Sequence, residues 1–228
     1  TRDENAEWVG TFADGMKRLV RQRGGRFIKQ AYGTVLCTFQ SPTDAVLFGM
    51  MAVDAAWEWS RGRQALMTYG IRVGINLGEV RVERGDVFGD PVNVAARVMA
   101  KAGVGEVWFS DAVWLAMNRM EVDAEGMGPH ELKGVPVPVR LFRALPVKGH
   151  VASPDQPPLG TRLLSSSRGV IPDGSGAGAA LDKGAAAVVQ TMGKAAGLAG
   201  TAAHAVRTGL GHARGALAGL WQRIPEQH

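Results

Sequence analysis

The chain has a single cysteine among its 228 residues, and this scarcity excludes an internal disulfide. Cys37 lies in the apolar run from residue 35 to 39, which favours a buried core residue over a reactive thiol. No charged segment followed by an apolar segment opens the sequence, so a secretory leader is not expected. These features favour a reducing compartment, and we expect a cytoplasmic location.

Long apolar runs and dense charge are also missing. No stretch contains 18 uncharged apolar residues, so a membrane-spanning helix is not expected. The formal net charge of +5 is spread along the chain without a dense Lys/Arg run, which argues against nucleic-acid binding. The histidines have no metal-ligand spacing with one another or with cysteine, and they are His130, His150, His204, His212 and His228.

Composition divides the chain into three parts. Residues 1–146 have the mixed composition of a domain with a core, and residues 147–173 form a Pro/Ser/Gly-rich linker. Alanine and glycine dominate residues 174–228, where a broken apolar stripe interrupted by glycines predicts a weakly helical tail. A flexible tail, a helix on a membrane surface and a helix that binds a partner remain alternatives.

Hydrophobic periodicity predicts helices and strands in residues 1–146. Apolar residues at helical spacing indicate a helix around residues 8–20, and Ser41 is expected to cap a helix that starts at Pro42. Ser110 is expected to cap a later helix. The expected strands are 26–29, 34–39, 67–76, 106–109 and 137–143. The pattern is typical of an α+β fold with helices on a sheet.

The most informative stretch is DVFGDPVNVAAR, residues 86–97. Pro91 suits the first turn of a helix, and Asn93 and Arg97 lie four positions apart on one helix face. A helix N-terminus attracts phosphate, and Gly89 leaves room for a ligand near the backbone. The pair therefore predicts an anion site, although a helix cap and a surface ion-pair donor would also explain these two residues.

The segment Phe88-Gly89-x-x-Val92-Asn93-x-Ala95-Ala96-Arg97 resembles the signature of the class III nucleotidyl cyclases, the adenylyl and guanylyl cyclase family. Three further motifs resemble this family in the same order, and they are residues 24–29 (GGRFIK), 71–80 (IRVGINLGEV) and 132–135 (LKGV). The resemblance covers roughly residues 5 to 145. It implies a ferredoxin-like βαββαβ core.

The resemblance also implies roles for five residues. Asn93 and Arg97 would orient the ribose and stabilise the transition state at the α-phosphate. Lys29 and Asp86 fall where adenylyl cyclases contact the purine, and this pairing favours ATP over GTP because a carboxylate cannot accept a hydrogen bond from guanine O6. Lys133 would bind the terminal phosphates.

The chain departs from the family at its metal site. Cyclases of this family use two Mg²⁺ or Mn²⁺ ions held by two aspartates, and Gly33 stands where one aspartate is expected. The other aspartate belongs to a first strand before the first helix. This strand is expected to be missing here, which would leave an open sheet edge and indicates either a truncated sequence or an unusual fold. Asp14 is not a substitute, because its neighbours have helical spacing and it is predicted to be a solvated helix residue.

Two interpretations follow. The domain resembles the half of a heterodimeric cyclase that supplies the purine and transition-state residues, while a second cyclase domain supplies the metal ligands. The domain is expected to form homodimers or heterodimers, and a complemented heterodimer would convert ATP to cyclic AMP and pyrophosphate. Two copies of this chain alone would have no evident metal site. Alternatively, it is an inactive pseudo-cyclase that binds nucleotide or acts as a dimerisation module.

Overall fold

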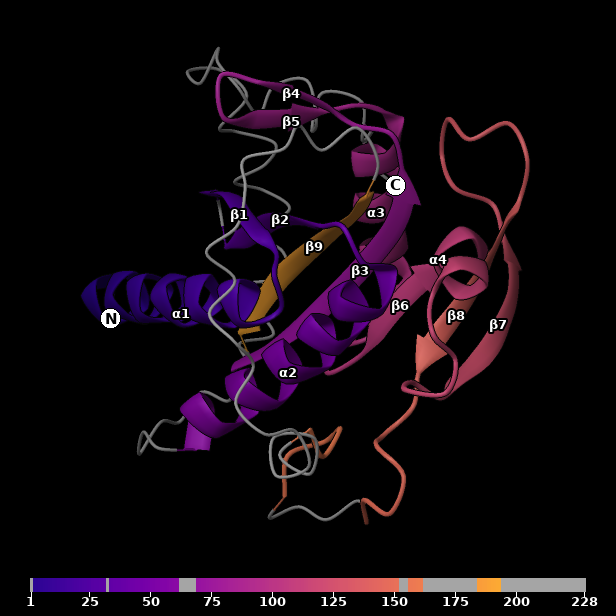
Figure 1. The fold of residues 1–228 in the computed structure, drawn as a ribbon. Helices are drawn as coiled ribbons and strands as arrows, with labels where there is room; N and C mark the ends of the chain where they lie inside the picture. Colours follow the sequence, from indigo (N-terminus) through magenta and orange to yellow (C-terminus); the bar gives the residue numbers. More distant parts are fainter. Residues whose placement is uncertain (1, 32, 62–68, 152–155, 162–183, 194–228) are drawn as a thin grey trace.

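A computed structural model describes residues 2–31, 33–61, 69–151, 156–161 and 184–193 (Figure 1). For residues 2–11, 61, 69 and 184–193 it describes the backbone alone. The first half holds α1 (Arg2–Gln22), β1 (Arg26–Ala31), β2 (Thr34–Phe39), α2 (Pro42–Arg61), β3 (Tyr69–Gly78), β4 (Arg81–Glu83) and β5 (Asp86–Phe88). Then follow α3 (Asp90–Lys101), β6 (Val107–Ser110), α4 (Asp111–Ala116), β7 (Ala124–His130), β8 (Val139–Ala144) and β9 (Gly184–Gly193).

Seven strands form one sheet in the order β1-β2-β9-β3-β6-β8-β7, and β4 and β5 form a separate hairpin. The pairs within the large sheet are antiparallel except for β3 with β6. The expected α+β class is therefore confirmed, and the strands around residues 26–39 lie close to their predicted bounds. Helix α1 covers the predicted range 8–20 but begins earlier, at Arg2.

Strand β9 lies in the middle of this sheet, between β2 and β3, as Figure 1 shows in orange. It is antiparallel to both neighbours, with Val188 opposite Leu36 of β2 and opposite Gly74 of β3. Helix α2 connects β2 to β3, which run parallel to each other but are not adjacent in the sheet. The connection therefore leaves room for one strand between them. Taken with β9 first, the order β9-α1-β1-β2-α2-β3 is the βαββαβ core of a ferredoxin-like fold.

Two expectations from the sequence are therefore wrong, one about the missing first strand and one about the tail. The position of the missing first strand is not an open edge, because β9 pairs with both sides of it. Residues 184–193 of the predicted weakly helical tail form this strand, since β2 and β3 offer backbone hydrogen-bond partners on both sides, whereas a short isolated helix is only marginally stable in water. The remainder of the tail lies outside the described residues.

Part of the predicted linker also packs on the domain. Leu159 and Thr161 are buried, and the backbone N–H of Val147 donates a hydrogen bond to the carbonyl of Leu159 at 2.9 Å. Residues 152–155 and 162–173 of the predicted linker lie outside the described residues. The folded unit therefore continues beyond residue 146.

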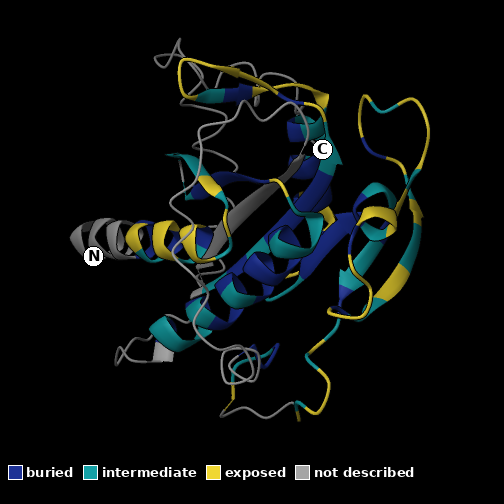
Figure 2. Ribbon diagram, in the orientation of Figure 1, coloured by how far each residue is buried: buried dark blue, intermediate teal, exposed yellow. Residues whose placement is uncertain are grey.

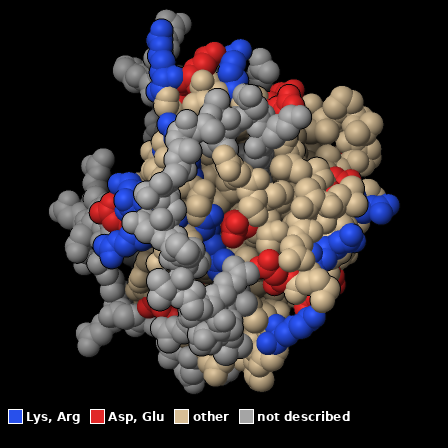
Figure 3. Space-filling model, viewed as in Figure 1, with Lys and Arg blue, Asp and Glu red and all other residues tan. Residues whose placement is uncertain are grey.

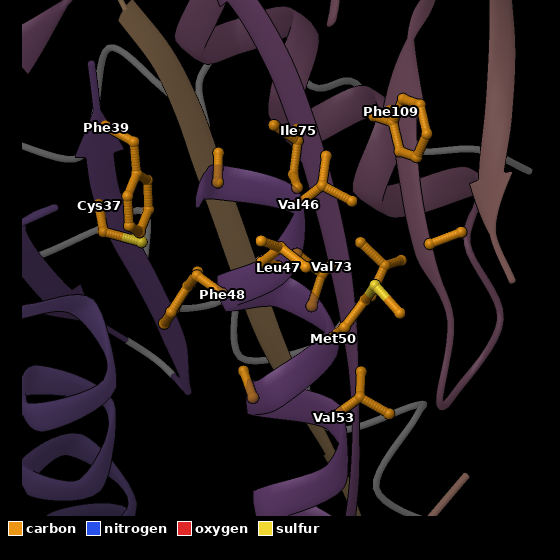
Figure 4. Packing of buried hydrophobic residues seen from close by; sticks show 14 of the residues in the cluster. Cys37, Phe39, Val46, Leu47, Phe48, Met50, Val53, Val73, Ile75 and Phe109 are labelled. Atoms are coloured by element: carbon orange, nitrogen blue, oxygen red, sulfur yellow. The ribbon is translucent and has the colours of Figure 1, made fainter. Parts of the chain in front are cut away.

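The main hydrophobic core lies on the face of the sheet that α1 and α2 cover. In Figure 4, α2 contributes side chains that interlock with those of β2, β3 and β6; the labelled residues are Cys37, Phe39, Val46, Leu47, Phe48, Met50, Val53, Val73, Ile75 and Phe109. Figure 2 shows dark blue burial concentrated at this contact, while the β4–β5 hairpin is largely exposed. Within the described residues, no helix has the length and apolar character needed to cross a bilayer.

Helix α3 packs on the other face of the sheet. Gly74 and Gly78 of β3 lie beneath it, and a Cβ atom on Gly74 would lie 2.2 Å from the backbone nitrogen of Met99. A second cluster joins this helix to β2, where Leu36 packs with Val92 and Ala95. The two glycines therefore allow α3 to lie directly against the strand.

Candidate active site

Lys29 of β1 and Asp86 of β5 form an ion pair, with 2.5 Å between Nζ and Oδ2. Both side chains are largely buried, at 20% and 16% exposure. The other carboxylate oxygen, Oδ1, accepts a hydrogen bond from the backbone N–H of Val87 at 2.8 Å, which fixes the orientation of Asp86. The structure thus brings together two predicted purine-binding residues that are 57 positions apart in the sequence.

Helix α3 carries the other predicted pair. It begins after Gly89, whose φ of 139° lies in a region that favours glycine, and Pro91 occupies the first turn as predicted. Asn93 and Arg97 are partly exposed and lie one turn apart on the helix. An amide and a guanidinium are therefore accessible on the same side of α3.

Arg97 lies beside the turn that carries Lys133. A Cβ atom on Gly134 would lie 3.4 Å from Nη2 of Arg97, so this glycine leaves room for the guanidinium. The N–H of Val135 donates to the carbonyl of Leu132 at 2.9 Å and closes the turn. Leu132 is buried against the C-terminal half of α3, while Lys133 is exposed. The structure therefore places a second cationic side chain in the loop next to Arg97.

The family described as "Adenylate and Guanylate cyclase catalytic domain" matches residues 18–145. The chain belongs to this family. The serine/threonine-protein kinase pkn2 of Myxococcus xanthus is 34% identical over 170 residues, and the putative adenylate cyclase 3 of Rhizobium meliloti is 35% identical over 128 residues. The matches cover 74% and 56% of this chain, but only 20% and 22% of those two proteins.

Solved cyclase structures share the fold. An adenylate/guanylate cyclase/hydrolase from Silicibacter pomeroyi is 27% identical with a TM-score of 0.50, covering 57% of this chain and 78% of that one. The adenylyl cyclase CyaB from P. aeruginosa has a TM-score of 0.55 at 17% identity, covering 66% and 86%. The predicted cyclase fold is thus confirmed by both sequence and structure.

The described part of this cyclase domain does not fit a divalent metal ion. Gly33 has no side chain to offer at the hairpin between β1 and β2, and the sequence of β9 contains no acidic residue. No group of three or more His, Cys, Asp or Glu side chains suited to a metal occurs among the described residues. Asp14 is 66% exposed on α1 and pairs with Lys17 at 3.0 Å, as expected for a solvated helix residue.

Charged side chains of both signs are interspersed on the visible face in Figure 3, so the described part of this face carries no patch of one sign. A cavity of about 280 Å³ lies elsewhere, between Arg23, Leu47, Met50 and the segments 120–123 and 145–148. None of the five predicted site residues lines it. The candidate active site therefore lies outside this cavity.

Sequence reasoning missed a polar link beneath α3. Ser110 is at the N-cap position of α4 as predicted, but its hydroxyl makes no cap and instead donates to Oδ1 of Asn76 at 2.6 Å. The cap expectation failed because the buried amide of Asn76 requires a donor. The available signal was the pattern Gly74-x-Asn76-x-Gly78, in which one polar residue shares a strand face with two glycines.

Proposed function

We propose that this domain is the nucleotide-binding half of a class III adenylate cyclase, converting ATP to cyclic AMP and pyrophosphate when a second cyclase domain supplies the metal carboxylates. The observation that carries the proposal is the Lys29–Asp86 pair, because it places a hydrogen-bond donor beside an acceptor in a largely buried position. Adenine presents a ring nitrogen that accepts and an exocyclic amine that donates.

Asp86 keeps lone pairs for a base while it contacts Lys29. A lysine ammonium has three donors, and the bond to Asp86 uses one of them. A carboxylate offers about four lone-pair sites, of which Lys29 and the Val87 N–H use two. We infer that adenine binds beside this pair, with Lys29 donating to the ring nitrogen and Asp86 accepting from the amine.

Arg97 and Asn93 act at the sugar and phosphate. A guanidinium is always charged and presents several donors in a plane, which suits the charge that develops on a phosphate during transfer. Asn93, one turn earlier on α3, orients the ribose, and Lys133 next to Arg97 binds the terminal phosphates. The partner is a related cyclase domain that keeps its metal aspartates, because a second copy of this chain would also carry Gly33 at that position.

The deciding experiment measures cyclic AMP formed from ATP with Mn²⁺. The chain is assayed alone and mixed with a homologous domain that keeps its metal aspartates but lacks the arginine equivalent to Arg97. We expect product only in the mixture, and we expect Arg97→Ala in this chain to abolish it. Arg140→Ala is the matched control, since Arg140 is an exposed arginine on β8.

Gly33 offers no carboxylate where the family has a metal aspartate, and this also supports the second candidate, a pseudo-cyclase that binds nucleotide without turnover. Calorimetry with ATP distinguishes the two. Binding that depends on Lys29 and Asp86, without product in any mixture, would favour the pseudo-cyclase. Product from the chain alone would contradict the complementary-half proposal.

A further inference from the structure

One face of β3 is adapted to α3. Successive residues of a strand point to opposite faces, so Gly74, Asn76 and Gly78 share the face that α3 covers. A Cβ atom on Gly78 would lie 2.4 Å from Cγ of Pro91, and the equivalent atom on Gly74 would meet the helix backbone. Of these three positions under the helix, only Asn76 therefore has a side chain, and that side chain is polar.

Asn76 joins two elements across this contact. Its side chain is 7% exposed, and Nδ2 donates to the carbonyl oxygen of Pro91 in the first turn of α3 at 3.3 Å. Oδ1 accepts the hydroxyl hydrogen of Ser110 at the end of β6 at 2.6 Å. The Pro91 carbonyl can only accept, so the orientation of the amide follows from its partners.

Ser110 bonds to Asn76 and does not cap the helix that follows it, α4. It occupies the N-cap position of α4, where a serine hydroxyl ordinarily accepts from the helix backbone, yet its hydroxyl bonds Asn76. The side chain is 1% exposed, so the bond between Ser110 and Asn76 is shielded from water. Two strands, β3 and β6, therefore hold the first turn of α3 through one amide.

We propose that Asn76 and Ser110 are positioning residues that fix the first turn of α3 and, through it, the direction of Asn93 and Arg97. The inference rests on the proposed function for its catalytic consequence. Pro91 precedes Asn93 by two residues and Arg97 by six, so a shift of this turn moves both side chains. Displacements of about 1 Å in positioned groups reduce turnover by about a hundredfold.

The test uses the complemented cyclase assay with Asn76→Leu, Ser110→Ala and the double variant. We expect kcat to fall at least tenfold in Asn76→Leu and severalfold in Ser110→Ala, with less than additive loss in the double variant. The KM for ATP should stay within about twofold, because Lys29 and Asp86 lie on β1 and β5. Ser110→Thr, which keeps the hydroxyl, should retain turnover.

Ser60→Ala is the matched control. Ser60 is also 7% exposed, and its hydroxyl donates to the carbonyl of Trp57 at 2.7 Å within α2. We expect this variant to lower the melting temperature without changing kcat. An equal fall of kcat in Ser60→Ala and Ser110→Ala would overturn the inference, as would a rise of KM with kcat unchanged.

Hydrogen exchange of the free domain gives a readout that does not depend on activity. Amides in residues 93–98 should exchange faster in Asn76→Leu and Ser110→Ala than in Ser60→Ala. If the wild-type mixture makes no cyclic AMP, the proposed function fails, and faster exchange still supports the positioning of α3. Unchanged exchange overturns the positioning inference, and Ser110→Ala carries the test if Asn76→Leu does not fold.

Discussion

Thr161 donates two hydrogen bonds to the carboxylate of Asp54, a residue 107 positions earlier in the chain. Its backbone N–H and its hydroxyl lie 2.7 and 2.6 Å from Oδ2, while the N–H of Leu159 lies 2.7 Å from Oδ1. Asp54 is 3% exposed on α2. The segment after β8 is therefore bound to the second helix through a buried carboxylate.

Asp54→Ala should destabilise the domain by about 3 kcal/mol, because it leaves two backbone N–H groups and one hydroxyl without their charged acceptor. Urea unfolding followed by circular dichroism measures the loss. Asp14→Ala removes a carboxylate from an exposed pair on α1 and should change stability by less than about 0.5 kcal/mol. Equal effects of the two variants would contradict the role of Asp54.

Cys37 should not react with thiol reagents in the native domain. Burial raises the pKa of the Cys37 thiol well above its usual value, and the side chain is fully buried in the core. Labelling with iodoacetamide at pH 8 should therefore be negligible before unfolding and should reach one thiol per chain in 6 M guanidinium. Rapid labelling of the folded protein would show that β2 opens readily.

Local patterns predicted much of the fold. The helical spacing of Phe12, Met16 and Val20 gave α1, and the hydroxyl of Ser41 accepts the N–H of Asp44 at 3.2 Å at the start of α2, as expected. The motif around Arg97 located α3. These elements were predictable because the signals lie within one helix or at its ends.

Elements that depend on distant partners were not predictable. Strand β9 has an Ala-rich sequence with little preference for strands, and only the space between β2 and β3 makes it a strand. Strand β7 contains Pro129 and two glycines, which its place at the sheet edge tolerates. The pattern around Asn76 marks a polar residue under α3, but it does not identify Ser110 as the partner, which lies 34 positions later.

The stability of the domain should fall below about pH 4 partly through Glu106. Burial alone would raise the pKa of Glu106, but hydrogen bonds from Gly103, Arg143 and Trp108 and the charge of Arg143 lower it overall. A carboxyl whose pKa is lower in the folded state stabilises that state above its unfolded pKa of about 4.3, and the contribution is lost as the pH falls through the folded value.

Glu106→Gln should therefore lower stability by about 1 kcal/mol at pH 7, and the difference from wild type should shrink as the pH is lowered from about 4.3 to 3. Urea midpoints at pH 7, 4 and 3 measure this. Glu83→Gln is the control, because Glu83 pairs with Arg81 on an exposed hairpin. A difference for Glu106→Gln that stays constant from pH 7 to 3 would contradict the assigned shift.

Gly74→Ala should destabilise the domain by about 3 kcal/mol, because the added Cβ atom would lie 2.2 to 2.5 Å from the α3 backbone and force the helix away from β3. Gly126→Ala on β7 is the matched control, since its nearest neighbour would be Cε1 of Phe142 at 3.8 Å. Thermal unfolding of both variants measures the contrast. A wild-type melting temperature for Gly74→Ala would show that α3 does not lie this close to the sheet.

Removal of strand β9 should affect the stability of the domain more than any of the substitutions above, and two truncated chains test this. A chain ending at Gly193 keeps the strand, whereas one ending at Lys183 removes it and leaves the facing backbone groups of β2 and β3 without partners. We expect the longer chain to unfold cooperatively as a monodisperse species. The shorter one should aggregate or pair through the exposed strands, as sedimentation would show. Equal stability and equal sedimentation of the two chains would mean that β9 does not hold the centre of the sheet.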